Sequence, residues 1–273
     1  MLYSKNMPVC TSLLPSKQAL YQNPTAKIGP GSTPEIGFVQ IFLANPMVLR
    51  YAMEKGGVAV KDIPMFTTEY GIASLILKEI PYKATAYIKV RSTEEPEKLL
   101  AECVQFCRMC GADIVDASGH SFLETYPLTT AMYAMQCPWD ALAKMDACLF
   151  PVTEQTLSQW LQIYNDRMAN VANSAYMDSR DGKELLKAGD GYFVHRDGKL
   201  LGIGKAAGDT IDAVATVERG MGETVVRTLA TALTAETVRL TVASTNAKAL
   251  ALYERLGFVK TAEISRWYRV FGK

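Results

Sequence analysis

Four residues, Arg219-Gly220-Met221-Gly222, stand where a predicted strand runs into a predicted helix. The first N–H groups of a helix have no acceptor inside it, and the helix dipole adds a partial positive charge there. Glycines would let an anion approach those N–H groups, and Arg219 adds a fixed charge suited to a diphosphate. The stretch is neither a Walker loop nor a Gly-x-Gly-x-x-Gly dinucleotide motif, so an ordinary glycine-rich turn is the alternative interpretation.

A second stretch that could do chemistry is "STNAKALALYERLGFVK", residues 244–260. Ser244 or Asn246 can cap a helix here, because a short side-chain oxygen accepts a hydrogen bond from a first-turn N–H. Apolar residues recur at three- and four-residue spacing around Tyr253, and Gly257 can end the helix in a left-handed conformation. Tyr253 is therefore a core aromatic residue, a phenol available as a proton donor, or both.

The elements that must position these residues form a regular series over residues 147–273. Asp197-Gly198 and Gly208-Asp209 are pairs typical of tight hairpin turns. The pattern predicts the order β-α-α-β-β-β-α-β-α-β, with a strand over 147–152, a helix from Thr153 to about Ala169, a shorter helix over 179–189, a three-stranded meander, and then the two stretches above. This length suits one domain.

Arg-Gly-x-Gly at a strand-to-helix turn, followed by a strand and "NAKALALYERLGF", resembles the GNAT superfamily of acyl-CoA-dependent acyltransferases. The resemblance implies an α+β fold for residues 146–273, with a mixed, mainly antiparallel sheet flanked by helices. It implies acetyl-CoA or coenzyme A as co-substrate. The main-chain amides that would hold its diphosphate are those of Arg219, Gly220, Met221, Gly222, Glu223 and Thr224. The chain departs from the family pattern at Thr224, where Gly or Ala is usual, and the loop from Val214 to Arg219 looks short.

The same resemblance implies roles for residues outside this loop. Asn246 would contact the pantetheine arm, and Tyr253 would give a proton to the departing thiolate. The backbone at Val214, Ala215 and Thr216 would lie along pantetheine, with an N–H polarising the thioester carbonyl. A base for the incoming amine is less evident, and enzymes of this family are thought to lose that proton through water. The candidates are Asp212, Glu218 and His195 with Asp197, although a solvated surface residue is the favoured interpretation for each.

The first half of the chain has a different composition. Residues 1–36 contain five prolines and are predicted to be an extended segment, and residues 37–145 to be a smaller α/β domain that includes a helix over 45–57. The order strand, strand, helix, strand over about 70–118 matches the middle of the second domain, which suggests a degenerate GNAT-like copy. A split sheet that shows this order by chance is the alternative.

The loop that would bind the diphosphate differs between the two copies. The first has "RSTEEPEK" where the second has "ERGMGET". Glu94 and Glu95 would repel a diphosphate, and Pro96 would remove an amide donor. A first copy that has lost the cofactor would then shape the acceptor site or a dimer interface.

Composition limits the classes of function. The chain has 273 residues, a net charge of +1, 49% hydrophobic and 21% charged residues, which is ordinary for a globular protein and gives no global attraction for nucleic acid. No apolar run reaches the roughly 20 residues of a membrane span, so we expect a cytoplasmic protein with no membrane partner. Cys103, Cys107 and Cys110 share one face of a predicted helix. Buried thiols are the expected state there and a metal or redox site is the alternative, so no metal is assigned.

These features predict an acyltransferase that moves an acetyl group from acetyl-CoA to an amine in a ternary complex. A non-catalytic coenzyme A-binding or scaffold protein is the alternative, and a metal-dependent redox protein is a third. The acceptor, a small molecule or a peptide, would be selected by residues 153–189. Asp178, Asp181 and Glu184 would favour a cationic acceptor if they face the cleft, or else they form a solvated helix surface. A homodimer is compatible with all of this.

Overall fold

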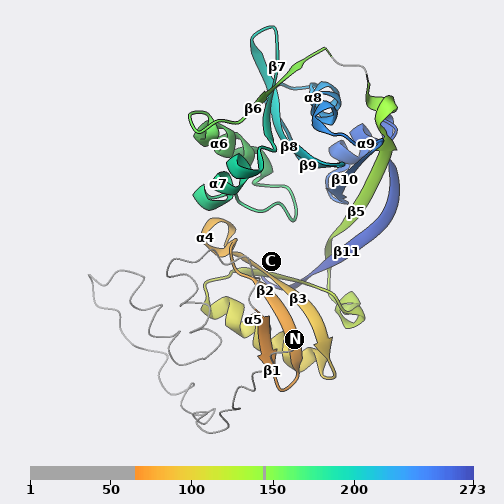
Figure 1. The fold of residues 1–273 in the computed structure, drawn as a ribbon. Helices are drawn as coiled ribbons and strands as arrows, with labels where there is room; N and C mark the ends of the chain where they lie inside the picture. Colours follow the sequence, from red (N-terminus) through yellow and green to blue (C-terminus); the bar gives the residue numbers. More distant parts are fainter. Residues whose placement is uncertain (1–64, 144–145) are drawn as a thin grey trace, which may run out of the picture. The chain divides into compact units, whose positions relative to one another are not determined.

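The computed structural model of the protein describes residues 65–143, here called the first half, and residues 146–273, the second half. The extended segment expected over 1–36 and the helix expected over 45–57 lie outside the described residues. Residues 62–273 form one compact unit. Within it, strands from both halves join in an eleven-stranded mixed sheet (Figure 1). The predicted division of the chain near residue 145 into two domains stays a proposal.

The second half has the element order that the sequence predicts. Its elements are β6 (Cys148–Pro151), α6 (Leu157–Met168), α7 (Ser179–Ala188), β7 (Gly191–Arg196), β8 (Lys199–Ala207), β9 (Thr210–Thr216), α8 (Gly222–Leu229), β10 (Thr237–Ala243), α9 (Ala247–Arg255) and β11 (Val259–Phe271). Asp197 and Gly198 turn the β7–β8 hairpin with φ angles of 52° and 74°. The first helix begins at Leu157, one turn later than expected.

The first half contains the predicted strands and two more. Its elements are β1 (Met65–Thr68), β2 (Gly71–Ile76), α4 (Ile80–Lys83), β3 (Thr85–Thr93), α5 (Pro96–Met109), β4 (Ile114–Ser118) and β5 (Leu128–Pro138). The first two of the predicted strands, β2 and β3, pair antiparallel as a hairpin with the one-turn helix α4 between them. Helix α5 has Glu95 at its N-cap position and no side-chain capping bond, while the Thr93 hydroxyl accepts from Glu95 N–H and donates to Tyr70 O.

The two halves repeat one pattern and exchange their last strands. Each contains a parallel strand pair joined by a helix, β3 and β4 through α5 in the first half, β9 and β10 through α8 in the second. The next strand of each half then pairs with the other half, β5 with β10 and β11 with β4. The series β1-β2-β3-β4-β11 therefore mirrors the series β7-β8-β9-β10-β5. A mixed sheet with a crossover helix in the first half is what the predicted repeat requires.

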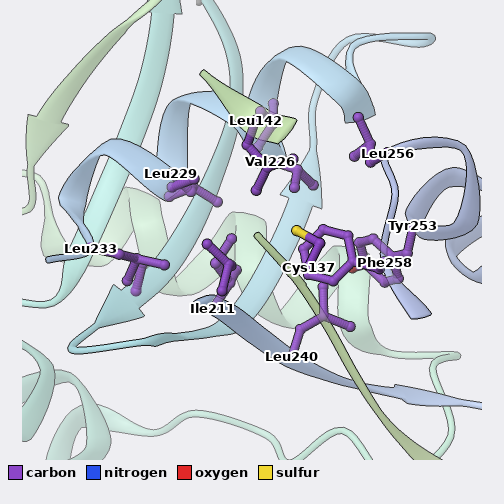
Figure 2. Packing of buried hydrophobic residues seen from close by; sticks show 14 of the residues in the cluster. Cys137, Leu142, Ile211, Val226, Leu229, Leu233, Leu240, Tyr253, Leu256 and Phe258 are labelled. Carbon is purple, nitrogen blue, oxygen red and sulfur yellow. The ribbon is translucent and has the colours of Figure 1, made fainter. Parts of the chain in front are cut away.

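In the second half, helices cover both faces of the sheet (Figure 1). Helices α8 and α9 pack on one face over Leu240 and Val242 of β10, and this core also contains Tyr253 and Phe258 (Figure 2). Helices α6 and α7 pack on the other face, where Trp160 is fully buried. Because side chains alternate along a strand, Thr241, between Leu240 and Val242, faces the side of α6 and α7.

Candidate functional site

The parallel pair of the second half opens along its length. Strands β9 and β10 pair at only two positions, of which the last is Ile211 with Leu240, although β9 continues to Thr216 and β10 to Ala243. The corresponding pair in the first half is closed, since β3 pairs with every residue of β4. Backbone groups of β9 and β10 beyond Leu240 therefore have no partner across this gap, and a ligand can approach them.

A β-bulge directs the polar backbone of β9 into this gap. The register between β8 and β9 shifts at Asp212, a residue that stands opposite no residue of β8 in the strand pairing. Beyond the bulge, Val217 N–H donates to Leu201 O at 2.9 Å. Because hydrogen-bonded and non-hydrogen-bonded pairs alternate in an antiparallel ladder, the backbone N–H and C=O groups of the residues between such pairs point away from β8. The N–H and C=O groups of Val214 and Thr216 accordingly point into the gap between β9 and β10.

The third residue that the resemblance assigned to this strand behaves differently. By the same alternation, the backbone of Ala215 bonds with β8, opposite Ile203. Its side chain is buried in the core beneath α6. Of the three predicted backbone contacts, two therefore have the orientation to meet a ligand in the gap.

The loop after β9 presents free donors and an uncompensated positive charge. Val225 N–H donates to Met221 O at 2.9 Å, which makes it the first hydrogen bond of α8. The N–H groups of Gly222, Glu223 and Thr224 precede it, and no side chain caps them. Arg219 is exposed and makes no ion pair or hydrogen bond with a described residue.

The carboxylate in this first turn is neutralised within the protein. Glu223 Oε1 lies 3.0 Å from Arg227 Nε, and its Oε2 lies 3.8 Å from Arg255 Nε. Arg227 also donates to Ala141 O at 2.7 Å. These contacts offset the negative charge nearest to the free N–H groups, so the end of α8 remains suited to an anion.

The two glycines of the loop serve different purposes. Gly220 has a φ of 84°, a backbone conformation that residues other than glycine rarely adopt. A Cβ at this position would meet nothing within 4 Å. At Gly222, a Cβ would lie 2.8 Å from Leu252 Cδ2 of α9. Gly222 thus allows α8 to pack closely on α9, which is a different reason from the close anion approach that the sequence suggested.

Asn246 caps α9, as one of the two sequence interpretations expected. Its Oδ1 accepts from Ala249 N–H at 3.2 Å, which leaves the side-chain NH₂ without a partner among the described residues. Ser244 does something else, because its Oγ accepts from Ala131 N–H of β5 at 2.9 Å. Asn246 can therefore cap the helix with its oxygen and present its amide donors to a ligand.

Tyr253 lies at the other end of α9, in the core. Gly257 N–H donates to Glu254 O and Phe258 N–H to Tyr253 O, the pattern of a Schellman end, and Phe258 packs against Tyr253 at 5.6 Å between ring centroids. Burial raises the pKa of Tyr253 to about 12. The side chain is 8% exposed, and its hydroxyl bonds to no described residue (Figure 2). The hydroxyl is not among the buried side-chain atoms that lack a partner, so it reaches the protein surface, where a ligand can bond to it.

The candidate bases are engaged elsewhere or lie at the hairpin β7–β8. Asp212 and Glu218 each form an ion pair with a lysine of β8, at 2.9 and 3.0 Å. His195 lies opposite Cys148 of the edge strand β6, with its Nδ1 buried and unpartnered. Asp197 is in the turn itself. These positions favour the surface interpretation for both carboxylates that flank β9.

The acidic residues of α7 mainly serve that helix. Asp178 caps it by accepting from the N–H groups of Arg180 and Asp181, and the side chain of Asp181 accepts from Asp178 N–H. Asp181 also pairs with Lys78 of the first half at 2.6 Å. Glu184 is exposed on the helix. Two of the three residues that could have attracted a cationic acceptor are thus held in a capping box.

The cysteines of α5 contribute to packing. Cys103 and Cys107 are fully buried, and burial raises the pKa of Cys103 to about 12 and that of Cys107 still higher. Within residues 65–143 and 146–273, no cluster of three or more metal-ligating side chains occurs. No helix in this part of the chain has the length and apolar character to cross a membrane.

A pocket beside the strand gap could not be predicted from any sequence motif. A pocket of about 350 Å³ is lined by residues of both halves, among them Glu79, Asn173, Thr241 and Trp267. These residues are far apart in the sequence, and only the fold brings them together. The one available signal was Glu79, a charged residue within the apolar run "SLILKEIPY".

Residues 214–268 match a family model described as FR47-like protein. No curated protein matches the chain in sequence.

Several solved structures are similar to this chain. A conserved protein of unknown function from Staphylococcus epidermidis has 14% identity and a TM-score of 0.49, covering 80% of this chain and 98% of its own. A tandem GNAT protein from the clavulanic acid biosynthesis pathway has 13% identity and a TM-score of 0.44, with coverage of 73% and 78%. A GCN5-related N-acetyltransferase from Kribbella flavida has 9% identity and a TM-score of 0.48, with coverage of 75% and 58%. At such identities the likeness concerns the fold and says nothing of the substrate. What the comparisons show of this chain itself is a sequence similar to the FR47-like family over residues 214–268.

Proposed function

We propose that this protein is an acyl-CoA-dependent N-acyltransferase that moves an acetyl group to the amine of a small molecule or peptide. The observation that carries the proposal is the gap between β9 and β10, which ends beside the uncapped start of α8. Free backbone groups line the gap, and free N–H groups with Arg219 follow it. This is the arrangement that an extended thiol ester with an anionic diphosphate at one end would require.

The residues present fit acetyl-CoA. The N–H groups of Gly222, Glu223 and Thr224, with the unpaired Arg219, would hold the diphosphate. Thr224 meets this role through its backbone, so its side chain is no obstacle to that contact. The NH₂ group of Asn246 and the backbone of Val214 and Thr216 would bind the pantetheine arm. Acetyl-CoA, as co-substrate, would supply the activated acyl carbon.

The chain's own groups would then assist the transfer. An N–H in the gap would polarise the thioester carbonyl while the amine nitrogen forms the new C–N bond and the C–S bond breaks. The Tyr253 hydroxyl would donate its proton to the departing sulfur and take up, through water, the proton that the nitrogen loses. A thiol is ordinarily a stronger acid than a phenol with a pKa of about 12, so Tyr253 must be reprotonated in the same event.

A non-catalytic coenzyme A-binding protein is the second candidate. The high pKa of Tyr253 favours it, because a weakly acidic phenol is a poor source of a proton for a thiolate. Both candidates require the same binding site and differ in turnover alone.

Calorimetric titration with acetyl-CoA tests the proposed site. We expect micromolar binding by the wild-type protein and at least a tenfold loss of affinity in Arg219→Glu, because the new carboxylate would repel the diphosphate. Lys183→Glu is the matched control, since Lys183 is exposed on α7, makes no contact with a described residue and carries the same change of charge. Equal affinity in all three proteins, or no binding by the wild type, would contradict the proposal. Arg219→Glu is a cleaner probe than a change at Gly222, which would also disturb the packing of α8 on α9.

A further inference from the structure

The pocket of about 350 Å³ lies on the face of the sheet that carries α6 and α7, and it is small for a ligand site. Its walls are mainly apolar and aromatic. They are formed by Ile76, Tyr87 and Met132 of the first half and by Ile264 and Trp267 of β11. The Tyr87 and Trp267 rings meet edge to face, 5.4 Å between centroids and at 81°. This is a firm aromatic wall suited to an apolar ligand.

The pocket reaches the point where the strand gap begins. Thr241, which lines it, follows Leu240, the last residue of β10 that pairs with β9. The neighbours of Thr241 on the strand face the core beneath α8 and α9. A ligand in the pocket would therefore meet the gap from the face opposite to α8 and α9. Two substrates could thus reach the same gap from opposite faces of the sheet.

The single carboxylate in the wall is already satisfied. Glu79 is 2% exposed, and both of its oxygens accept from Tyr176 N–H, at 3.1 and 3.0 Å. Lys83 Nζ lies 3.7 Å from Glu79 and donates to Ser174 O at 2.5 Å. The interior of the pocket therefore offers no uncompensated negative charge to a cationic group, and a second charge buried there would cost several kcal/mol.

One donor in the wall has no partner. Asn173 Nδ2 is buried without a hydrogen bond to a described residue, and Asn173 is held at a φ of 58° in the connection between α6 and α7. A buried amide donor without a partner is costly unless a ligand or water supplies an acceptor. A water molecule or an oxygen of the ligand can satisfy it, so this donor does not require a particular class of ligand.

We propose that this pocket binds the acyl acceptor, and that the acceptor is a primary amine on an aromatic or branched apolar body. The inference rests on the transferase function proposed above and adds the substrate class. The amine nitrogen lies at the Thr241 end, toward the gap, and the apolar body lies against Tyr87, Trp267 and Ile264. The first half, whose own parallel strand pair is closed, thus supplies one wall of the acceptor site.

A panel of amines tests the substrate class. Coenzyme A release from acetyl-CoA is measured with phenethylamine, isoamylamine, spermidine and a lysine-containing peptide at equal concentrations. All four are ammonium ions near neutral pH, but spermidine and the peptide carry further charged or polar groups that would have to enter the apolar part of the pocket. We therefore expect phenethylamine and isoamylamine to be turned over at least tenfold faster than spermidine and the peptide. Faster turnover of spermidine or the peptide would overturn the inference and leave the transferase function in place.

A matched pair of variants locates the site. Ile264 and Val259 are both on β11 and are 55% and 59% exposed, but only Ile264 lines the pocket. Ile264→Glu should raise the KM for phenethylamine at least tenfold without changing the affinity for acetyl-CoA. Val259→Glu should leave both unchanged. Equal effects of the two substitutions on KM would contradict this location.

Direct binding separates the two proposals. Phenethylamine is titrated in a calorimeter into the protein without acetyl-CoA, and acetyl-CoA is titrated separately. Binding of the amine that Ile264→Glu abolishes, without acetyl-CoA binding, would keep the pocket and overturn the transfer. Binding of acetyl-CoA without binding of phenethylamine, coupled with turnover of spermidine or the peptide only, would overturn the pocket. Binding of neither would overturn both.

Discussion

At the scale of the residue, Tyr253 shows how burial changes a side chain that a motif identifies. The spacing of Asn246, Tyr253 and Gly257 is legible in the sequence because capping, an apolar stripe and a helix stop are local properties. The raised pKa of Tyr253 and its unpartnered hydroxyl could not be predicted from the sequence, since they depend on the packing of β10 and of the segment that follows α9. Likewise, the role of Gly222 depends on Leu252, thirty positions away.

Replacing Tyr253 by phenylalanine should lower turnover about a hundredfold, because the proton donor is lost, and leave acetyl-CoA affinity unchanged. Turnover equal to that of the wild type would remove Tyr253 from catalysis.

The same variant tests the raised pKa of Tyr253. The folded protein keeps the Tyr253 proton up to about pH 12, whereas an unfolded tyrosine loses it near 10. The stabilising effect is complete below pH 10 and disappears as the pH rises through 12, a change of about 3 kcal/mol in all. Urea unfolding of the wild type at pH 8 and 11 should show part of this loss, and Tyr253→Phe a smaller one.

At the scale of the element, the first half holds the α6–α7 connection beside the pocket. Tyr82 of α4 stacks on Tyr176 with 3.7 Å between ring centroids, and Glu79 and Lys83 bind the backbone of Tyr176 and Ser174. The order of two strands, a helix and a strand over about residues 70–118 was predictable from the sequence. These partners were not, because they lie roughly 90 residues along the chain. Strand β5 was missed for a related reason: it pairs with β10 and β11, which come about a hundred positions or more later.

Replacing Glu79 by glutamine should weaken this connection. A neutral amide accepts less strongly from Tyr176 N–H and leaves Lys83 without its counter-charge, so we expect a loss of about 2 kcal/mol in the free energy of unfolding. Hydrogen exchange at Tyr176 N–H should become faster, and the KM for phenethylamine should rise while acetyl-CoA affinity stays the same. Glu184→Gln, on the exposed side of α7, is the control. Unchanged exchange at Tyr176 would show that Glu79 does not position the connection.

At the scale of the whole molecule, the exchanged strands β5 and β11 join the halves through the middle of the sheet. The order of elements within each half could be predicted, but the exchange could not, because either last strand could complete its own half with the same local pattern. The ion pair of Asp116 on β4 and Arg269 on β11, 2.6 Å apart, lies across this junction. Asp116 is 7% exposed. The pKa of Asp116 is raised, because burial raises it more than the hydrogen bond from Arg269 lowers it.

Replacing Arg269 by methionine should leave a buried carboxylate without its partner and reduce stability by about 3 kcal/mol at neutral pH. The loss should shrink as the pH falls, because burial favours the protonated form of Asp116 in the folded protein, which then takes up a proton at a higher pH than the unfolded chain. The double variant Asp116→Asn/Arg269→Met should recover much of the stability. Urea unfolding at pH 7 and pH 4.5 would measure this, and a pH-independent loss would show that Asp116 is not the cause.

The exchange of strands also has a consequence for how the molecule is made. Strand β4 is complete once residue 118 has been synthesised, but its partner β11 begins at Val259 and is among the last residues described. Until then the edge of β4 that pairs with β11 has no partner. Strand β5 is also unpaired, because its partners β10 and β11 both come later. The first half therefore cannot finish folding on the ribosome ahead of the second. Ribosome-bound chains that stop before residue 259 should remain sensitive to protease in both halves, and such open strand edges are where nascent chains associate wrongly or recruit chaperones.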